Sequence, residues 1–310
     1  MQRIAIIGAG LCGLRCAEVL QTGGIEVQLF DKSRGLGGRL ATRRHQHWRF
    51  DHGCPSLHGE QGEWQQLIDR YSAWYTEGAV GTRRLPPLGI NQLAKDLGAS
   101  MHVHRDCLIE SVEQTSDGWL LRDHHGTEFA NYHRVVMTLP PPQAMTLLAS
   151  LDTPLSSRLE TVSMAPSWVM MCVAPSALIE NPEHYPENSC IERITAEHSK
   201  PGRTLPEHEY AYVVEATPQW SAQQEELDAD TAADHLTQEL QRLTPHSLQL
   251  THRAAHRWRY AHTKQALGEP WLFDSELGLA LAGDWCLGNG AESAYYSGTA
   301  LAQILLQERG

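Results

Sequence analysis

Residues 4–13 read Ile-Ala-Ile-Ile-Gly-Ala-Gly-Leu-Cys-Gly, and this stretch decides the fold. The apolar run before the glycines is too short for a helix and rich in β-branched residues, which indicates a strand. A helical stretch follows and stops at Gly23-Gly24, and a second predicted strand, Glu26 to Phe30, ends on Asp31. Strand, glycine turn, helix, strand and acid follow one another at the spacing of a dinucleotide-binding βαβ unit.

Each glycine of this turn has its own predicted role. Gly8 makes the turn, Gly10 lets the backbone approach a pyrophosphate, and Gly13 lets the helix pack on the strand. The N–H groups and the positive dipole of the helix N-terminus then face the phosphates. We expect Asp31 to accept hydrogen bonds from both hydroxyls of an adenosine ribose, and an acid there disfavours a 2′-phosphate.

A second glycine pair follows in the segment Arg34-Gly-Leu-Gly-Gly-Arg-Leu-Ala-Thr42. Gly37 and Gly38 permit positive φ and close backbone approach, and Arg39 can form a forked contact with phosphate oxygens. A surface turn with solvated arginines is the alternative. The segment resembles the R-x-x-G-G-R-x-x-[ST] segment of the flavin-dependent amine oxidase superfamily, which implies a place along the FAD pyrophosphate.

The other end of the chain carries a third signal. A predicted strand, Leu277 to Ala282, closes on Gly283-Asp284, and a predicted helix runs from Ala291 to Leu306. In FAD proteins of this superfamily such a Gly-Asp binds the ribityl chain, and the helix N-terminus lies towards the flavin C2=O. The resemblance implies that residues 8–13 and 283–294 meet around one coenzyme.

Further segments narrow the resemblance to bacterial renalase-type flavoproteins, a branch of that superfamily. They are residues 30–39, 135–143, 219–221, 256–261 and 283–287. The chain departs from the branch at residues 51–57 and 84–90, where an aromatic-containing segment and a Gly-x-Pro-Gly-Met segment are usual. Both departures fall where the substrate pocket is expected.

The resemblance implies an FAD-dependent oxidase. Because no flavin-attachment signature surrounds Cys12, Cys54 or Cys286, we expect the FAD to be non-covalent. The substrate would be a small reduced molecule, an isomeric dihydro-NAD(P), which passes hydride to flavin N5; O₂ then accepts the electrons and gives H₂O₂. Hydride loss from a dihydronicotinamide needs no proton removal, which suits a sequence with no obvious acid–base dyad. Oxidation of a small amine, and a flavin-containing binding or regulatory protein without turnover, are the alternatives.

We predict an α/β fold with two lobes. A Rossmann-like FAD-binding lobe with a parallel sheet comprises residues 1–50, 91–150 and 266–310. A second α+β substrate lobe with a mainly antiparallel sheet comprises residues 51–90 and 151–265. The run from Val135 to Leu139 is almost entirely apolar, so we expect a central strand that is buried on both faces.

The candidate site residues fall into two groups. Those expected to bind the cofactor are Gly8, Gly10, Leu11, Cys12, Gly13, Asp31, Lys32, Arg34, Gly37, Gly38, Arg39, Leu40, Thr42, Asp51, His52, Gly53, Ile109, Thr138, Gly283, Asp284, Glu292, Ser293 and Ala294. Those expected to form the pocket wall, and so to act in catalysis, are His52, Trp258, Tyr260, Trp285 and Tyr296. Trp258 and Tyr260 can equally be core residues, and His52 a structural hydrogen-bonding group.

Bulk properties limit the class of partner. A formal net charge of −12 argues against nucleic acid and anionic lipid as partners. No apolar run approaches the roughly 18 residues of a membrane span, and no leader pattern is seen. Seven cysteines without a C-x-x-C pair argue against a disulfide framework, and we expect a cytoplasmic protein.

Two further segments carry weaker expectations. His102, His104, His124 and His125 invite a metal hypothesis, but no cysteine or acid completes a ligand set, so a solvated sheet edge is favoured. Residues 200–208 contain Lys-Pro-Gly-Arg and are predicted to form an exposed loop.

Overall fold

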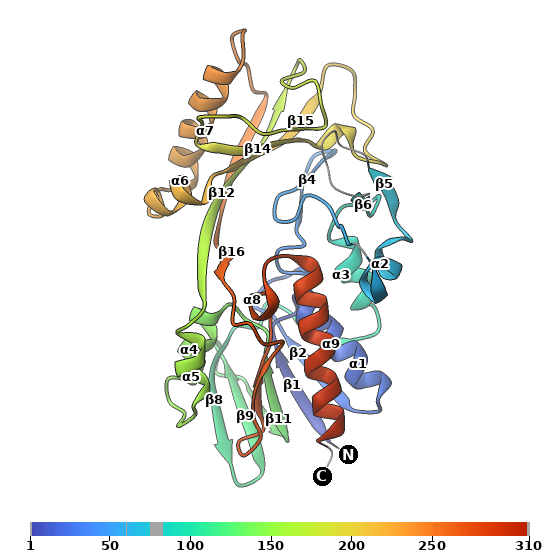
Figure 1. Cartoon of the computed structure of the whole chain (residues 1–310), viewed down its shortest axis with the longest axis vertical. Helices are drawn as coiled ribbons and strands as arrows, with labels where there is room; N and C mark the ends of the chain where they lie inside the picture. Colours follow the sequence, from blue (N-terminus) through green and yellow to red (C-terminus); the bar gives the residue numbers. More distant parts are fainter. Residues whose placement is uncertain (1, 60, 75–82, 309–310) are drawn as a thin grey trace. The chain divides into compact units, whose positions relative to one another are not determined.

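The computed structural model describes residues 2–59, 61–74 and 83–308, which form two compact units. Unit 1 comprises residues 1–40, 93–164 and 263–310, and unit 2 comprises residues 41–92 and 165–262. Both units are discontinuous in sequence, so each is built from segments far apart along the chain (Figure 1).

A six-stranded sheet forms the centre of unit 1, in the order β17-β18-β11-β1-β2-β7. Its neighbouring strands pair in parallel, except that β17 runs antiparallel to β18. The strands are β1 (Arg3–Ile7), β2 (Glu26–Phe30), β7 (His102–His104), β11 (Arg134–Met137), β17 (Leu272–Asp274) and β18 (Leu279–Leu281). β11 lies between β18 and β1, and Val135, Val136 and Met137 have no exposed surface, which confirms the expected central strand.

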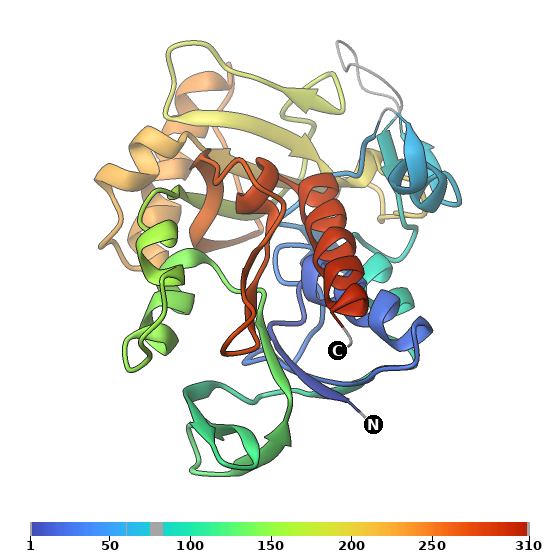
Figure 2. The same cartoon turned by 60° about the horizontal axis from the view of Figure 1, so that its bottom comes forward.

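Two helices from opposite ends of the chain lie side by side in unit 1 (Figures 1 and 2). They are α1 (Leu11–Thr22) and α9 (Ala291–Gln307). A Cβ built at Gly298 of α9 would lie 2.4 Å from the carbonyl oxygen of Cys12, so only glycine permits this approach. The remaining elements of unit 1 are a three-stranded sheet of β8 (Ile109–Thr115), β9 (Gly118–Asp123) and β10 (Glu128–Tyr132), and the helices α4 (Pro141–Leu148), α5 (Leu155–Leu159) and α8 (Asp284–Leu287). The helix α3 (Gln92–Leu97) begins in unit 2 and continues into unit 1.

Unit 2 is built on a five-stranded sheet in the order β13-β14-β15-β12-β16. The pairs β13/β14, β14/β15 and β12/β15 are antiparallel. The strands are β12 (Ser163–Ala174), β13 (Glu183–His184), β14 (Ile191–Ala196), β15 (Tyr210–Ala216) and β16 (His252–Gln265). The first residues of β12 and the last of β16 belong to unit 1.

The two faces of this sheet bury different partners. On one face Trp168 and Met170 of β12 pack against the apolar side of α7 (Ala229–Leu243). On the other face Val169 and Met171 pack against the hairpin of β3 (Thr42–His45) and β4 (Trp48–Asp51). Alternate residues of one strand therefore serve two cores. The smaller elements of unit 2 are α2 (Gly62–Ile68), β5 (Ser72–Trp74), β6 (Arg83–Leu85), η1 (Glu197–Ser199) and α6 (Pro218–Gln223).

The fold class is confirmed: a Rossmann-like domain with a largely parallel sheet accompanies a second domain with an antiparallel sheet. The limits of the units differ from the predicted lobes at residues 41–50, 91–92, 151–164 and 263–265, and the two longer differences have a clear physical reason. Residues 41–50 belong to unit 2, because Trp48 and Phe50 are buried in its core. Residues 151–164 belong to unit 1, because Leu155 and Leu159 of α5 are buried in its core.

Two of the four histidines that invited a metal hypothesis are neighbours on the edge strand of the unit 1 sheet. His102 and His104 share one face of β7, with ring centroids 4.6 Å apart, as strand alternation predicts. His104 also stacks on Phe30 at 4.7 Å, so its ring serves packing. Across residues 2–59, 61–74 and 83–308, no three His, Cys, Asp or Glu side chains are grouped as a metal site.

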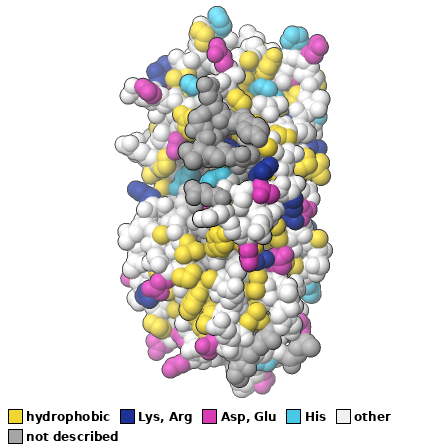
Figure 3. Space-filling view, turned by 45° about the vertical axis from the view of Figure 1, so that its right-hand side comes forward, with side chains coloured by type: hydrophobic (Ala, Val, Ile, Leu, Met, Phe, Trp, Pro, Cys, Tyr) yellow, Lys and Arg dark blue, Asp and Glu magenta, His cyan; other side chains and the backbone are white. Residues whose placement is uncertain are grey.

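The distribution of surface charge and the length of the helices also bear on the expectations from the sequence. On the face shown in Figure 3, basic and acidic side chains are interspersed rather than gathered by sign. In the described part of the chain, none of the helices has both the length and the apolar character needed to cross a membrane.

Candidate functional site

The glycine turn after β1 has the geometry that its spacing predicts. Gly8 has a φ of 110°, and a Cβ there would lie 2.7 Å from Thr138 Oγ1. A Cβ at Gly13 would lie 2.1 Å from the Gly8 carbonyl oxygen, so Gly13 is required for α1 to begin here. A Cβ at Gly10 would meet no atom within 4 Å. Gly8 and Gly13 are therefore needed for packing, whereas Gly10 borders open space.

The second glycine segment lies directly against the first. The Gly37 N–H donates to the Ala9 carbonyl oxygen at 2.8 Å, and a Cβ at Gly38 would lie 3.6 Å from the Gly10 Cα. Gly37 and Gly38 have φ values of 109° and 56°. Two glycine segments that are separate in sequence thus form one backbone surface.

Asp31 lies at the end of β2 beside this surface. Its Oδ2 accepts from the Ala9 N–H at 2.7 Å and its Oδ1 accepts from the Ser33 N–H at 2.8 Å. Each carboxylate oxygen keeps a second lone pair that can accept from a ligand hydroxyl. The carboxylate is therefore held rigidly by backbone groups, as a ribose-binding residue requires.

Arg39 connects the glycine surface to the C-terminal segment. Its guanidinium lies 2.5 Å from Asp284 Oδ1, and the Asp284 side chain is only 4% exposed. Asp284 Oδ2 also accepts from the Gly290 N–H at 3.3 Å. Residues 8–13 and 283–290 therefore lie together in unit 1, as expected. Arg39, predicted to contact phosphate, here pairs with the predicted ribityl-binding carboxylate.

Both helices that begin at this place lack a side-chain cap. The residue before α1 is Gly10 and the residue before α9 is Gly290, and no side chain accepts a hydrogen bond from either first turn. Uncapped N–H groups can bind an anionic or carbonyl oxygen of a ligand. Of the three N–H groups expected to face a flavin, that of Ala294 donates instead to the Gly290 carbonyl oxygen at 3.2 Å. Glu292 and Ser293 precede it in the same half-buried turn.

Several other predicted cofactor residues can act only through their backbone. The side chains of Leu11, Cys12, Leu40 and Ile109 are between 4% and 5% exposed, so they are packing groups. Thr138 donates to the Gly8 carbonyl oxygen at 2.9 Å and so supports the turn. Lys32 and Arg34 are exposed, and Arg34 lies 3.7 Å from Asp106. For Arg34 the structure matches the alternative of a solvated arginine.

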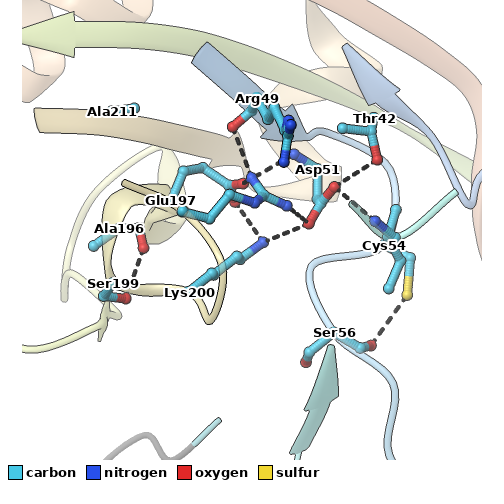
Figure 4. A network of polar contacts seen from close by, with 12 residues as sticks. Thr42, Arg49, Asp51, Cys54, Ser56, Ala196, Glu197, Ser199, Lys200 and Ala211 are labelled. Atoms are coloured by element: carbon cyan, nitrogen blue, oxygen red, sulfur yellow. Dashed lines mark hydrogen bonds and ion pairs between the residues drawn. The ribbon is translucent and has the colours of Figure 1, made fainter. Parts of the chain in front are cut away.

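In unit 2 the predicted cofactor residue Asp51 is instead the centre of a buried polar network (Figure 4). Its Oδ1 accepts from Thr42 Oγ1 at 2.7 Å and from the Ile90 N–H at 2.9 Å. Its Oδ2 accepts from Lys200 at 3.2 Å and from Arg203 at 2.5 Å. These contacts occupy the Asp51 carboxylate and the Thr42 hydroxyl. Both side chains thus have a structural role, and the binding of a cofactor by these two residues stays a prediction.

Glu197 completes this network. It lies 2.5 Å from Lys200 Nζ and 2.6 Å from Arg203, and it accepts from the Asp51 N–H at 3.0 Å. The four charged side chains are between 0% and 4% exposed. The expectation of an exposed loop at residues 200–208 is thus wrong for Lys200 and Arg203. The loop must fold inward because Asp51 and Glu197 would otherwise be buried without cations.

The pKa values follow from this arrangement. Burial alone would raise the pKa of Asp51, but Lys200 and Arg203 outweigh it and hold the pKa below its usual range. Burial dominates at Glu197, so its pKa is raised despite the same two cations. Sequence reasoning missed the network, because the residues that neutralise Asp51 lie about 150 positions away.

His52, the next residue, belongs to an aromatic cluster with His256 and Trp258 of β16. The His52 ring lies 5.3 Å from Trp258 and 5.1 Å from His256, and Trp258 Nε1 donates to the His52 carbonyl oxygen at 2.8 Å. Burial lowers the pKa of His52 and of His256 to about 4, so both rings are neutral at pH 7. His52 Nδ1 is buried without a hydrogen-bond partner. Trp258 and Tyr260 are half-buried, and Gly53 is too.

The last two predicted wall residues lie in unit 1. Trp285 is 1% exposed within the core, and its Nε1 donates to the Leu139 carbonyl oxygen at 3.0 Å. It is a packing residue, which corrects its prediction as a pocket wall. Tyr296 is half-buried in α9 and lies against Tyr295, with ring centroids 5.5 Å apart.

The structure also brings together a polar set that sequence reasoning did not find. Arg193 of β14 and Glu215 of β15 form an ion pair across the two strands. His262 Nε2 of β16 lies 3.3 Å from Glu215 Oε1. The sequence shows no obvious acid–base dyad, whereas the folded chain places this acid beside a histidine. Only the register of three strands brings the residues together, so no local sequence signal could reveal them.

Unit 2 also contains a shallow cavity of about 170 Å³ beside the buried network. Glu197 and Arg203 line it together with His198 and Leu205. None of the predicted site residues lines this cavity, so it does not help to locate the substrate.

Comparisons with known proteins agree with this geometry. Residues 6–71 match the family described as NAD(P)-binding Rossmann-like domain, and residues 70–306 match the family described as flavin containing amine oxidoreductase. A 51-residue stretch is 49% identical to 4,4′-diapolycopen-4-al dehydrogenase of Metabacillus indicus. That stretch spans 16% of this chain and 10% of the dehydrogenase.

Solved structures with a similar fold cover nearly the whole chain. A protein from Exiguobacterium sp. 255-15, assigned as a protoporphyrinogen oxidase, has a TM-score of 0.79 at 14% identity, over 99% of both chains. Putrescine oxidase bound to putrescine has a TM-score of 0.72 at 10% identity, over 99% of both chains. Reduced UDP-galactopyranose mutase has a TM-score of 0.77 at 12% identity, over 99% of this chain and 94% of that one.

At these identities the solved structures show the shared fold alone. The family match is stronger evidence, because it extends over most of the chain and includes the Gly283-Asp284 junction. It implies a flavin cofactor and an oxidoreductase. The chain belongs to the flavin-containing amine oxidoreductase family.

Proposed function

We propose that the protein is an FAD-dependent oxidase that takes hydride from a small reduced substrate, an isomeric dihydro-NAD(P). The observation that carries the cofactor assignment is the meeting of two uncapped helix starts in unit 1. Open space at Gly10 and at Gly290, where a Cβ would meet no atom within 4 Å, fits close approach of a ligand. When bound, the flavin supplies a hydride acceptor at N5 and returns the electrons to O₂ as H₂O₂.

The chain's own residues bind and orient in this proposal. Asp31 accepts from ribose hydroxyls, the N-terminus of α1 binds the diphosphate, and Asp284 binds the ribityl chain. The Glu292 and Ser293 N–H groups stabilise negative charge at the pyrimidine carbonyl. Each of these groups is held in place by contacts within unit 1, so binding needs little reorganisation.

Two observations support non-covalent attachment of the flavin. Cys12 and Cys286 are buried, and burial raises the pKa of Cys286 to about 12 and that of Cys12 well above its usual value. A thiol in that state is a poor nucleophile at neutral pH. Cys54 is half-buried, and burial raises its pKa too.

The neutral aromatic cluster of unit 2 supports the choice of substrate. His52 and His256 carry no charge at pH 7, and together with Trp258 they form an uncharged aromatic cluster in which His256 meets the other two rings edge-on. Such a cluster suits an uncharged ring. Hydride loss from a dihydronicotinamide leaves an aromatic pyridinium and requires no base. We propose that Trp258 and Tyr260 of unit 2 contact the substrate, and the predicted role of Tyr296 of unit 1 stays a separate proposal.

The test is to record the visible spectrum of the purified protein and then mix it anaerobically with dihydronicotinamide isomers and with a panel of small amines. We expect a yellow protein that an isomer bleaches and that air recolours. Bleaching by amines alone would instead identify an amine oxidase. A yellow protein that nothing reduces would indicate a binding or regulatory role, and a colourless protein without affinity for FAD would refute the proposal.

A further inference from the structure

The set Arg193, Glu215 and His262 lies on the same sheet face as the aromatic cluster of unit 2. Ala254 and Trp258 pack on the face of the sheet that carries the β3–β4 hairpin. Side chains alternate along a strand, so Tyr260 and His262 belong to this face too. Val213 packs on the same face, which places Glu215 there, and Arg193 lies opposite Glu215 in register. The aromatic residues are thus followed along β16 by a polar set.

The set has a hydrogen-bonding capacity that its internal contacts do not use up. His262 Nε2 is buried and makes no directed hydrogen bond, although Glu215 Oε1 lies 3.3 Å away. Glu215 pairs with Arg193 through its other oxygen, Oε2. Glu215 Oε1 and His262 Nε2 are therefore adjacent. The carboxylate oxygen can accept a hydrogen bond, and the imidazole nitrogen can donate one in the tautomer that carries its proton on Nε2.

The charges of this face are balanced. Glu215 is paired with Arg193, and Glu183, which lies opposite Thr195 on the same face, is 3.2 Å from Arg83. Burial alone would raise the pKa of Glu215, but Arg193 and His262 hold it below its usual range, so Glu215 stays ionised and is a weak base. A protonated amine would need a buried carboxylate without a cation, and neither Glu215 nor Glu183 offers one. An uncharged polar group fits better.

From this arrangement we infer that Glu215 and His262 bind the carboxamide of a dihydronicotinamide ring. The carboxamide N–H donates to Glu215 Oε1, His262 Nε2–H donates to the carboxamide oxygen, and Arg193 keeps Glu215 ionised and in place. The ring itself lies against Trp258 and Tyr260. This inference rests on the proposed function and specifies which part of the substrate these residues recognise.

The experiment uses the flavin-loaded protein and two probes in the same reduced isomeric forms. They are dihydronicotinamide adenine dinucleotide and its 3-acetylpyridine analogue, which keeps the carbonyl but has no N–H donor. The dependence of the anaerobic bleaching rate on probe concentration gives an apparent Kd and a limiting rate for each. We expect wild-type protein to bind the carboxamide probe about tenfold more tightly, because a hydrogen bond to a charged acceptor is lost with the analogue.

Variants separate the two contacts. Glu215→Gln should reduce the preference for the carboxamide to about threefold, because a neutral acceptor forms a weaker hydrogen bond. His262→Phe should weaken both probes about tenfold and leave their ratio unchanged, since both carry the carbonyl. His262→Gln, which restores a donor, should recover part of the affinity. His252→Phe is the matched control, because His252 lies on the same strand and face but stacks on His45 at 4.2 Å.

The outcomes distinguish this inference from the proposed function. If no dihydronicotinamide bleaches the wild-type flavin, the proposed function fails and the inference fails with it. If the flavin is bleached but the wild-type protein binds both probes equally, or His262→Phe changes affinity no more than His252→Phe, only the inference is refuted. Retained flavin colour and an unchanged melting temperature show that each variant is folded. Should Glu215→Gln lose its flavin, the His262 variants decide alone.

Discussion

Replacing Lys200 with methionine should strongly destabilise unit 2. Lys200 Nζ lies 2.5 Å from Glu197 and 3.2 Å from Asp51, and its side chain is 1% exposed. Its removal leaves two buried carboxylates with Arg203 as their remaining cation from the network. Breaking a buried ion pair by removing one partner costs about 3–5 kcal/mol. For a unit of this size, 3 kcal/mol corresponds to a decrease in melting temperature of roughly 6–12 °C.

The pH dependence of this loss has a definite sign. The pKa of Glu197 is already raised in the folded protein, so the folded state holds this proton more tightly than the unfolded chain. Removing Lys200 raises the pKa further, because a stabilising cation is gone. The cost is therefore largest at pH 7–8, where Glu197 must stay charged, and falls towards pH 5, where it takes up a proton.

The assay is thermal unfolding at pH 7.5 and pH 5, followed by tryptophan fluorescence. Arg253→Met is the control, because Arg253 pairs with Asp234 at the surface of the same unit, with side chains 41% and 54% exposed. An exposed pair contributes about 0–1 kcal/mol, so the control should shift little. A Lys200→Met protein that melts like the control, or whose deficit grows on acidification, would refute the reasoning.

Three further predictions concern glycines and histidines. Gly10→Ala should fold normally, but its Cβ would occupy the open space proposed for FAD, so the variant should bind FAD more weakly. Gly13→Ala should instead lower the melting temperature of the protein, because its Cβ would lie 2.1 Å from the Gly8 carbonyl oxygen. Flavin titration and apoprotein melting separate the two effects. Gly89→Ala should destabilise unit 2, because Gly89 has a φ of 118° and its Cβ would lie 2.5 Å from Thr42 Oγ1; urea unfolding measures the loss, and an unchanged midpoint would contradict it. In the folded protein the pKa of His256 is lowered to about 4, so between about pH 6.5 and pH 4 the unfolded chain binds more protons than the folded one. Wild-type stability therefore decreases as the pH is lowered through this range. His256→Phe removes this group and should make the decrease smaller. Urea midpoints across the window test this, and equal slopes for both proteins would exclude it.

The dinucleotide surface of unit 1 could be predicted from the sequence because its parts are local. Gly8, Gly10 and Gly13 act within one turn, and Asp31 follows at the end of the next strand. Steric restrictions on φ and on Cβ contacts make such a pattern readable without a structure. Gly283-Asp284 before a helix is assigned instead from the resemblance to the superfamily. Their meeting with residues 8–13, expected from the family resemblance, is realised through Arg39 and through the contact of Gly298 with Cys12.

Other side-chain contacts could not be predicted, because they depend on a partner that is distant in the sequence. Trp285 looked like a pocket aromatic next to the Gly-Asp, but it is buried because Leu139 accepts from its indole N–H and unit 1 packs around it. The position of Asp51 beside the flavin stays a prediction, but the structure shows that Lys200 and Arg203 occupy its carboxylate, which the sequence did not indicate. The residues next to Trp285 and Asp51 in the sequence do not indicate either contact.

The order of residues along the chain was enough to predict the βαβ unit, the two glycine segments, the acid that follows the second strand and the superfamily of the chain. Those features depend on local geometry, because residues that are close in the sequence are also close to one another in the folded chain. Folding, in contrast, sets which charges are buried together and which face of the unit 2 sheet carries Glu215, His262 and Trp258. Strand register and ion pairing act between residues far apart in sequence, and burial sets their energies, so these features exist only once the chain is folded.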